Sequence, residues 1–374
     1  MIVFFLRGAL PSMTIETEKL IQQIQDVKRR WGSRLTILAH YYCQDDVVAL
    51  ADFSGDSLGL SQKAAASTET EAILFCGVYF MAETADILVN YTEGSDQRNE
   101  KEIPVLMPDI GAGCPMADMA SEEDAKTCKE QLSQYIDFSD VTPITYINSS
   151  AATKAFVANN NGIVCTSANA DKIMNWAFER TSRILFLPDQ HLGRNTAIKR
   201  GVDQSKIVLW DPLQPSLGGN TPEQIQNAQV ILWKGCCPIH QRFSVDIVKK
   251  VREEHPDAII WVHPECPQEI VKLCDGAGST TKLIQVVNDA PAGSTLAIGT
   301  EWKLVERLRK QNPDKTFIWL GQYPSVCSNM AKSTLPKIVQ VLESLDAGKP
   351  TNQVRVDVQT ALAARAALKR MLEV

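Results

Sequence analysis

The chain has 374 residues, of which 44% are hydrophobic and 22% are charged, with 38 Lys plus Arg against 44 Asp plus Glu. This length predicts two or three domains with apolar cores, and 20 Gly with 18 Pro exclude a collagen-like or low-complexity chain. The formal charge of −6 comes without a block of basic residues, so we expect no nucleic acid and no membrane among the partners. No apolar run reaches about 18 residues, the length that crosses a bilayer.

The first ten residues, MIVFFLRGAL, lack the charged start, the longer apolar stretch and the cleavage site of a signal peptide. We therefore expect an unstructured extension, explained by a start site placed upstream of Met13, and a cytoplasmic protein. The following segment, Thr14–Trp31, is predicted to be an amphipathic helix because its apolar residues recur at helical spacing: Leu20, Ile24, Val27 and Trp31.

After this helix, short apolar runs rich in β-branched residues alternate with helical segments. We predict strands, in chain order, at Thr36–Ala39, Ala72–Cys76, Ile103–Met107, Pro143–Ile147, Ile163–Thr166, Arg183–Leu187, Gln229–Trp233, Ala258–Val262, Thr295–Ile298 and Thr316–Leu320. Helices are predicted between most of these runs, among them Ser61–Ser67, Ala151–Asn159 and Phe243–Glu254. Strands that are apolar on both faces and joined by helices predict an α/β fold with parallel sheets covered on both sides.

A weak threefold repeat runs through this pattern. The segments His40-Tyr-Tyr, Tyr146-Ile-Asn and His263-Pro-Glu each follow a predicted strand, and a later strand in each unit runs into a cysteine: Cys114, Cys237 or Cys327. Ligands of open α/β sheets bind outside the carboxyl ends of the strands. The repeat therefore predicts three α/β units of about 100 residues, each directing a polar cluster and a cysteine toward strand ends.

The ten cysteines are expected to be reduced, since disulfides are rare without secretion. Cys114 and Cys237 are each followed by Pro, which favours the first turn of a helix, where free N–H groups lower the pKa of a thiol and favour the metal-binding thiolate. Cys327 precedes a segment that can begin a helix. Cys266 has the same local chemistry and Cys236 adjoins Cys237, so spacing does not choose among the five.

Acid–base residues cluster after two of the strands. His40 and Tyr42 follow one strand, and His263 and Glu265 occupy the matching place in the third unit, so together they form a candidate proton-transfer set. A single buried His or Tyr is more often a core residue, and the repeat is what favours the functional interpretation. Further hydrogen-bonding groups come from the second unit or lie near a cysteine: Tyr146, Asn148, His191, and His240 with Arg242.

Three segments resemble anion sites. Ser57, Ser167 and Thr280 lie in short Gly- or Thr-containing segments that precede predicted helices, where backbone N–H groups and a hydroxyl can hold a phosphate or carboxylate. The alternative for each segment is that its side chain only caps the following helix, which stabilises the fold by about 1 kcal/mol. Their number suggests a ligand with several negative groups. The sequence has neither a nucleotide-binding phosphate loop nor a G-x-G-x-x-G fingerprint after a strand.

Taken together and in order from about residue 15 to the C-terminus, these motifs resemble the quinolinate synthase family of NAD biosynthesis. The motifs are His40-Tyr-Tyr-Cys-Gln, Gly55-Asp-Ser-Leu, Gly113-Cys-Pro-Met-Ala, Tyr146-Ile-Asn-Ser-Ser-Ala, Cys165-Thr-Ser-Ala-Asn-Ala, Pro188-Asp-Gln-His-Leu-Gly-Arg, Trp233-Lys-Gly-Cys-Cys, His263-Pro-Glu, Gly278-Ser-Thr and Cys327-Ser-Asn-Met-Ala.

The resemblance implies three similar parallel-sheet α/β/α domains around a pseudo-threefold axis, with the active site at their junction. We divide the chain into an N-terminal extension and helix at 1–34 and domains at 35–125, 126–240 and 241–374, the last with a C-terminal helix. The resemblance also implies a [4Fe-4S] cluster held by Cys114, Cys237 and Cys327. Tyr42, His263 and Glu265 match catalytic positions, and the implied substrate contacts are His40, Ser57, Tyr146, Ile147, Asn148, Ser167, His263, Pro264, Glu265 and Thr280.

The reaction implied by the resemblance condenses iminosuccinate with dihydroxyacetone phosphate to give quinolinate, phosphate and water. L-Aspartate oxidase or aspartate dehydrogenase would supply the iminosuccinate. Three cysteines for four irons leave one iron without a protein ligand, and that iron can act as a Lewis acid. Two other functions use the same residues: a non-catalytic iron–sulfur sensor and a metal-dependent phosphosugar aldolase. The C-x-x-C-x-x-C segment of some relatives is absent, because Gly321 and Pro324 stand where its first two cysteines would be.

Overall fold

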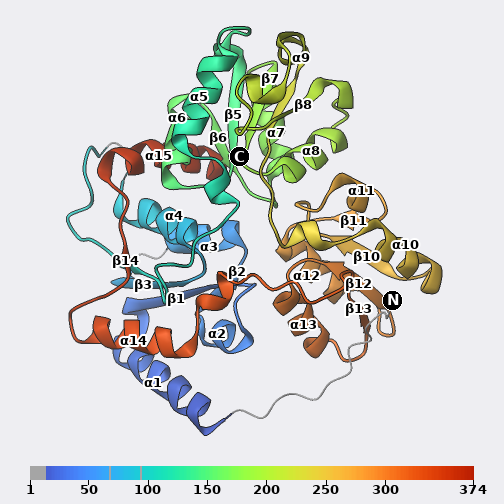
Figure 1. The fold of residues 1–374 in the computed structure, drawn as a ribbon. Helices are drawn as coiled ribbons and strands as arrows, with labels where there is room; N and C mark the ends of the chain where they lie inside the picture. The colour runs from blue at the N-terminus through green and yellow to red at the C-terminus, as the bar shows by residue number, and fades with distance from the viewer. Residues whose placement is uncertain (1–13, 67–68, 93–94) are drawn as a thin grey trace.

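The computed structural model describes residues 14–66, 69–92 and 95–374, whose strands form three separate sheets (Figure 1). The first sheet has the order β14 (Gln353–Val354), β4 (Val105–Leu106), β3 (Ala72–Cys76), β1 (Leu35–His40) and β2 (Phe53–Gly55). The second has the order β6 (Ile163–Cys165), β5 (Val141–Tyr146), β7 (Arg183–Leu187), β9 (Val230–Trp233) and β8 (Ile207–Trp210). The third has the order β11 (Gly276–Ala277), β10 (Ile259–Val262), β12 (Thr295–Gly299) and β13 (Thr316–Ile318).

Helices surround each sheet. Beside the first lie α1 (Ile15–Trp31), α2 (Asp45–Leu50), α3 (Ser57–Ala65) and α4 (Tyr79–Asn90). The second unit carries α5 (Glu122–Leu132), α6 (Ala151–Asn159), α7 (Ala170–Phe178), α8 (Gln190–Lys199) and α9 (Pro222–Asn227). The third carries α10 (Val245–Glu254), α11 (Gln268–Val271), α12 (Thr280–Asp289) and α13 (Trp302–Gln311), and the chain ends with α14 (Leu335–Asp346) and α15 (Val358–Glu373).

The predicted α/β fold is confirmed, and the burial of the strands explains why continuous apolar runs predicted them. Every residue of β1, β3 and β5 is buried, as expected for parallel strands covered on both faces. Within the described part of the chain, all strand pairs are parallel except β14 with β4. The pseudo-threefold relation of the three units stays a prediction, as do the domain limits.

The elements differ from the predictions in three ways. Four short strands were not predicted: β2, β8, β11 and β14. Of the predicted strand Ile103–Met107, only Val105–Leu106 is paired as strand β4, and the flanking Pro104 and Met107 each make one further backbone hydrogen bond to a neighbouring segment. The helix predicted at 61–67 begins earlier, at Ser57, since the Asp56 carboxylate accepts the N–H of Gly59 and caps it. The extension predicted for the first ten residues lies outside the described residues.

The C-terminal segment returns to the first sheet. Strand β14 pairs antiparallel with β4, and α14 packs on α1 (Figure 1). Helix α15 packs along α6 of the second unit and also contacts α4 of the first. Residues 335–374, which the predicted limits group with the third domain, thus make contacts with the first and second units. The segment therefore fastens the first and second units together.

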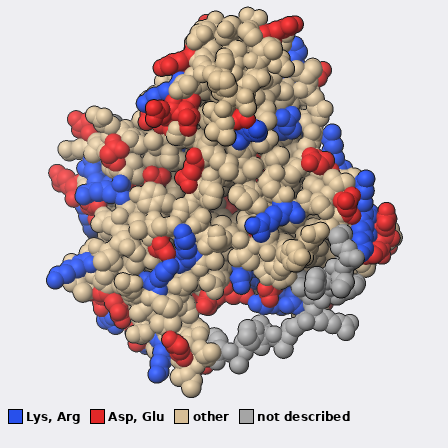
Figure 2. All heavy atoms as spheres, viewed as in Figure 1, with Lys and Arg blue, Asp and Glu red and all other residues tan. Residues whose placement is uncertain are grey.

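On the face shown in Figure 2, acidic and basic side chains are interspersed. No helix within the described residues combines the length and the apolar character needed to cross a membrane.

A buried ion-pair network anchors the returning segment. The Asp86 side chain on α4 is fully buried and accepts hydrogen bonds from Arg98 at 2.5 and 3.1 Å, from the Asn90 amide at 2.9 Å and from the N–H of Val356 at 3.0 Å. Removing one partner of a buried pair leaves the other charge uncompensated.

We therefore expect Asp86→Ala to lower the free energy of unfolding by about 3–5 kcal/mol, measured by urea denaturation. Lys101→Ala removes an exposed pair with Glu71 at 3.4 Å and should change it by less than about 1 kcal/mol. Equal effects of the two substitutions would contradict the anchoring role of Asp86.

Candidate active site

A cavity of about 160 Å³ is lined by residues from all three units. Most of the predicted site residues line it: His40, Tyr42, Ser57, Cys114, Tyr146, Asn148, Ser167, Cys237, His263, Glu265, Thr280 and Cys327. They lie at or after the carboxyl ends of strands, such as His40 at the end of β1 and Tyr146 at the end of β5. Parallel strands thus direct separate parts of the sequence to one place.

Each of the three lining cysteines begins a turn of the same form. The sulfur of Cys114 accepts hydrogen bonds from the N–H groups two and three residues later, and the sulfurs of Cys237 and Cys327 do the same. In each turn the cysteine carbonyl accepts the N–H four residues on, at 3.1, 3.3 and 3.0 Å. A short 3-10 helix starts three residues after each cysteine. The three cysteines thus share one local turn geometry.

The prediction that these turns lower the pKa of the thiols is wrong for the protein alone. Burial raises the pKa of Cys114 to about 12, although the N–H groups of Ala117 and Met116 act in the opposite direction. Burial likewise raises the pKa of Cys237 and of Cys327 above the ordinary value. The N–H groups are where a helix-like turn was expected to put them, but the loss of hydration outweighs them.

The two cysteines that spacing could not separate from these three do not line the cavity. Cys266 is fully buried, with its sulfur 4.0 Å from the carbonyl oxygen of Gly299. Cys236 is half-buried, and its N–H approaches the sulfur of Met119 at 3.5 Å. Cavity lining therefore selects Cys114, Cys237 and Cys327.

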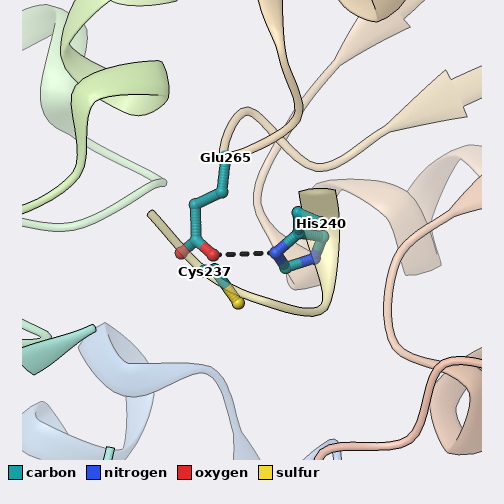
Figure 3. A group of neighbouring side chains, drawn as sticks. All are labelled: Cys237, His240 and Glu265. Carbon is teal, nitrogen blue, oxygen red and sulfur yellow. Dashed lines mark hydrogen bonds and ion pairs between the residues drawn. The ribbon is translucent and has the colours of Figure 1, made fainter. Parts of the chain in front are cut away.

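An acid–base network crosses the cavity wall. His240 Nδ1 lies 2.8 Å from a Glu265 carboxylate oxygen (Figure 3). The Nε2 of His240 lies 3.2 Å from the Thr300 hydroxyl. That hydroxyl is 2.7 Å from the Tyr42 hydroxyl. Tyr146 also hydrogen-bonds to Glu265. The four side chains from Tyr42 to Glu265 thus form a continuous path along which a proton can move.

Neighbouring imidazoles and hydrogen bonds lower the pKa of Glu265 despite its burial. Burial alone would raise the pKa of this carboxyl, but the neighbouring imidazoles and the hydrogen bonds from His240 and Tyr146 lower it below the ordinary value. Cys237, His240 and Glu265 also offer ligand atoms within 4.8 Å of one another (Figure 3). A metal-binding role is therefore compatible with this part of the cavity.

Two buried imidazoles are neutral hydrogen-bond donors. Burial lowers the pKa of His40 to about 4 and that of His263 to about 3. The Nδ1 of His40 accepts the N–H of Tyr42 at 3.1 Å, and that of His263 accepts the N–H of Glu265 at 3.4 Å. In a neutral imidazole the other nitrogen then carries the proton, so each ring keeps an Nε2–H donor.

Helix starts supply further donors. Asp56 and Ser279 cap α3 and α12 by accepting the N–H of Gly59 and of Lys282, so the plain capping role belongs to them. The next residues, Ser57 and Thr280, occupy the first helical positions and line the cavity. A hydroxyl beside free N–H groups can bind an anion.

Other predicted contacts lie elsewhere. Ile147 and Pro264 are buried but are not among the lining residues; the carbonyl of Pro264 accepts a hydrogen bond from the Asn195 amide at 2.9 Å. His191 does not line the cavity, whereas Arg242 does.

Sequence motifs make His240 only a secondary candidate and do not point to Thr300. His240 stands three residues after Cys237, so its position follows from the cysteine turn. Thr300 directly follows β12, a polar residue at a strand end, and that was the signal available for it. Its pairing with Tyr42 joins residues 258 positions apart, which no local pattern reveals.

Three α/β units around a cavity with buried thiols and an acid–base network define an enzyme with a candidate metal centre. The family described as NadA, Quinolinate synthetase A protein, matches residues 22–373. The quinolinate synthase of Rhodopirellula baltica is 46% identical over 364 residues, covering 97% of this chain and 93% of the relative. That of Corynebacterium glutamicum is 45% identical over 357 residues, covering 96% and 88%, and that of Bacillus anthracis is 44% identical over 361 residues, covering 96% and 94%.

The chain belongs to the quinolinate synthetase A family. These comparisons give no support to the sensor or the aldolase considered from the sequence. A solved structure, NAD+-bound 3-phosphoglycerate dehydrogenase of Entamoeba histolytica, covers 92% of this chain and 96% of its own at 9% identity, but its TM-score of 0.20 carries no argument.

The neutral state of the two imidazoles gives a prediction. Because burial lowers both pKa values, the nitrogen chemical shifts of His40 and His263 should stay constant between pH 8 and pH 5 in ¹⁵N NMR of cluster-free protein. The unfolded chain, with histidine pKa values of about 6.5, binds more protons below that pH, so the unfolding free energy should fall as pH falls from about 6.5 toward about 4.

The control is the same sample in urea, where all histidines should titrate near pH 6.5. A native-state titration of His40 or His263 between pH 6 and pH 7 would refute their role as neutral donors.

Proposed function

We propose that this chain makes quinolinate by condensing iminosuccinate with dihydroxyacetone phosphate, releasing inorganic phosphate and water. The observation that carries the proposal is the meeting of three similar cysteine turns, one from each unit, in a cavity that also holds the Glu265 network. Membership of the quinolinate synthetase A family supports the same reaction.

We further propose that Cys114, Cys237 and Cys327 hold a [4Fe-4S] cluster. Thiolates are the ligands of such clusters, and hydrogen bonds to the sulfurs tune them; each of the three sulfurs accepts two N–H groups. Because burial raises the pKa of all three thiols, metal binding would release their protons. With three protein ligands, the bound cluster would supply a Lewis-acidic iron for a substrate oxygen.

The anionic groups of the two substrates would be held by neutral donors. Ser57, Ser167 and Thr280 offer hydroxyls, and His40 and His263 offer Nε2–H groups. Neutral donors fit carboxylates and a phosphate ester without requiring a buried cation for each. Asn148 also lines the cavity: its Nδ2–H can donate to the same anionic groups, and its buried Oδ1, which has no hydrogen-bond partner, can accept from a substrate N–H or O–H.

Proton transfer would use the path from Tyr42 through Thr300 and His240 to Glu265. Condensation to a ring and loss of water require protons to be taken from carbon and nitrogen and given to leaving oxygen. The ionised Glu265 can accept a proton, and the Tyr42 hydroxyl can donate one, while Thr300 and His240 link the two. The burial of His240 and Glu265 keeps bulk water from this exchange.

The iminosuccinate would come from an enzyme that oxidises aspartate, either L-aspartate oxidase or aspartate dehydrogenase, and we place the reaction in the cytoplasm. The direct test is an oxygen-free assay with iminosuccinate generated in place and dihydroxyacetone phosphate, followed by chromatography of quinolinate. Formation of quinolinate with release of one phosphate per product is expected. A cluster-containing protein that forms none would overturn the proposal.

The proposed ligands are tested by single substitutions. Cys114→Ser, Cys237→Ser and Cys327→Ser should each abolish the brown iron–sulfur absorption of protein purified without oxygen, because the remaining thiolates hold the cluster weakly.

Cys236→Ser, adjacent to Cys237, and Cys266→Ser, deeply buried, are the matched controls and should keep the absorption. If any of the Cys114, Cys237 or Cys327 variants keeps the colour, or if both controls lose it, the assignment of these three cysteines as the cluster ligands would be wrong.

The proposed base is tested by a neutral isostere. Glu265→Gln should keep the cluster absorption but lower kcat by roughly 10²–10⁴-fold, the usual contribution of general acid–base catalysis. Glu269→Gln, an exposed neighbour outside the cavity lining, should leave kcat unchanged. Full activity of Glu265→Gln would take Glu265 out of the mechanism.

A further inference from the structure

Lys154 on α6 is the one lysine or arginine within the described residues that is fully buried. A buried ammonium is retained only where nearby groups compensate its lost hydration. The Nζ of Lys154 donates a hydrogen bond to the carbonyl oxygen of Ser149, and it lies 5.5 Å from the centroid of the Phe80 ring. Phe80 belongs to α4 of the first unit and lines the cavity.

Glu83, one turn after Phe80 on α4, completes this environment. Its carboxylate accepts the N–H of Ala151, the first residue of α6, at 3.0 Å. Burial lowers the pKa of Lys154 to about 8, and the charges of Glu83 and Cys114 oppose this shift. The first unit thus provides a ring and a carboxylate to the first turn of a helix in the second unit.

Hydrogen bonds of its N–H, hydroxyl and carbonyl groups hold Ser149 in place. Its N–H donates to the carbonyl of Ile147 at 2.8 Å, its hydroxyl donates to the carbonyl of Tyr146 at 2.8 Å, and its carbonyl accepts from Lys154. Asn148, which lies between Ile147 and Ser149, lines the cavity, and its buried Oδ1 has no hydrogen-bond partner. The turn held by Ser149 therefore determines where the Asn148 amide lies.

We propose that Lys154, supported across the unit boundary by Phe80 and Glu83 of the first unit, is a positioning residue: it fixes the Ser149 turn and so presents the Nδ2–H donors of Asn148 to the dicarboxylate substrate. This inference rests on the proposed function. It predicts that the boundary between α4 and α6, and not only the groups facing the cavity, sets the affinity for the dicarboxylate.

The test uses cluster-loaded protein and quinolinate, the dicarboxylate product, as the binding probe. Lys154→Met removes the ammonium but keeps most of the volume. Calorimetry should show its Kd for quinolinate raised at least tenfold, while the iron and sulfide content stays at the wild-type level and kcat falls less than threefold. Lys154→Arg, which retains a donor and a charge, should recover at least part of the affinity.

Lys315→Met is the matched control, because Lys315 also donates to a backbone carbonyl, that of Val287 at 2.8 Å, but outside the cavity lining. Its Kd for quinolinate should equal that of the wild type. Should Lys154→Met fail to fold, Glu83→Gln still tests the idea: it keeps the acceptor for Ala151 but removes the charge, and a two- to fivefold higher Kd is expected.

Wild-type affinity in a folded Lys154→Met protein, or in Glu83→Gln if the first does not fold, would overturn the inference. An equal loss in Lys315→Met would do the same. These results differ from failure of the proposed function, in which the wild-type protein itself neither forms nor binds quinolinate.

Discussion

The convergence of three cysteine turns on one cavity is the constraint on which the rest of the structure depends. Cys114, Cys237 and Cys327 follow strands of three different sheets. Their sulfurs therefore share a cavity only if the three units keep fixed positions relative to one another. The returning C-terminal segment contributes to this, since β14 pairs with the first sheet while α15 packs along α6 of the second. Burial makes three free thiolates unfavourable, and the metal cluster we propose would supply the positive charge that stabilises them.

The remaining chemistry of the cavity follows from its low hydration. Imidazoles at His40 and His263 lose their charge on burial and become oriented N–H donors. The imidazoles of His263 and His240, together with the hydrogen bonds from His240 and Tyr146, lower the pKa of Glu265 against the effect of burial. Hydration is also low behind the cavity wall, where the buried ammonium of Lys154 donates a hydrogen bond to the carbonyl oxygen of Ser149. Neutral donors, one stabilised carboxylate and one compensated cation together suit small, multiply anionic substrates.

The sequence was sufficient for features with a local signature. The strands Ala72–Cys76 and Arg183–Leu187 and the helix Ala151–Asn159 have the predicted limits, because continuous apolar runs and a Ser N-cap mark them. The two-residue strands β11 and β14 carry no such signal, and β14 depends on a partner far away in the chain. Motif resemblance named the three cysteines, whereas the raised thiol pKa values and the Tyr42–Thr300 contact depend on burial and on long-range packing. The roles assigned to the lining residues stay proposals.

Counting iron and acid-labile sulfide in protein purified without oxygen is the most direct test of the proposed cluster. A cluster held by one cysteine from each unit predicts about four irons and about four sulfides per chain, with the absorption of an iron–sulfur centre. A single metal ion per chain without sulfide, in protein that still forms quinolinate, would contradict it.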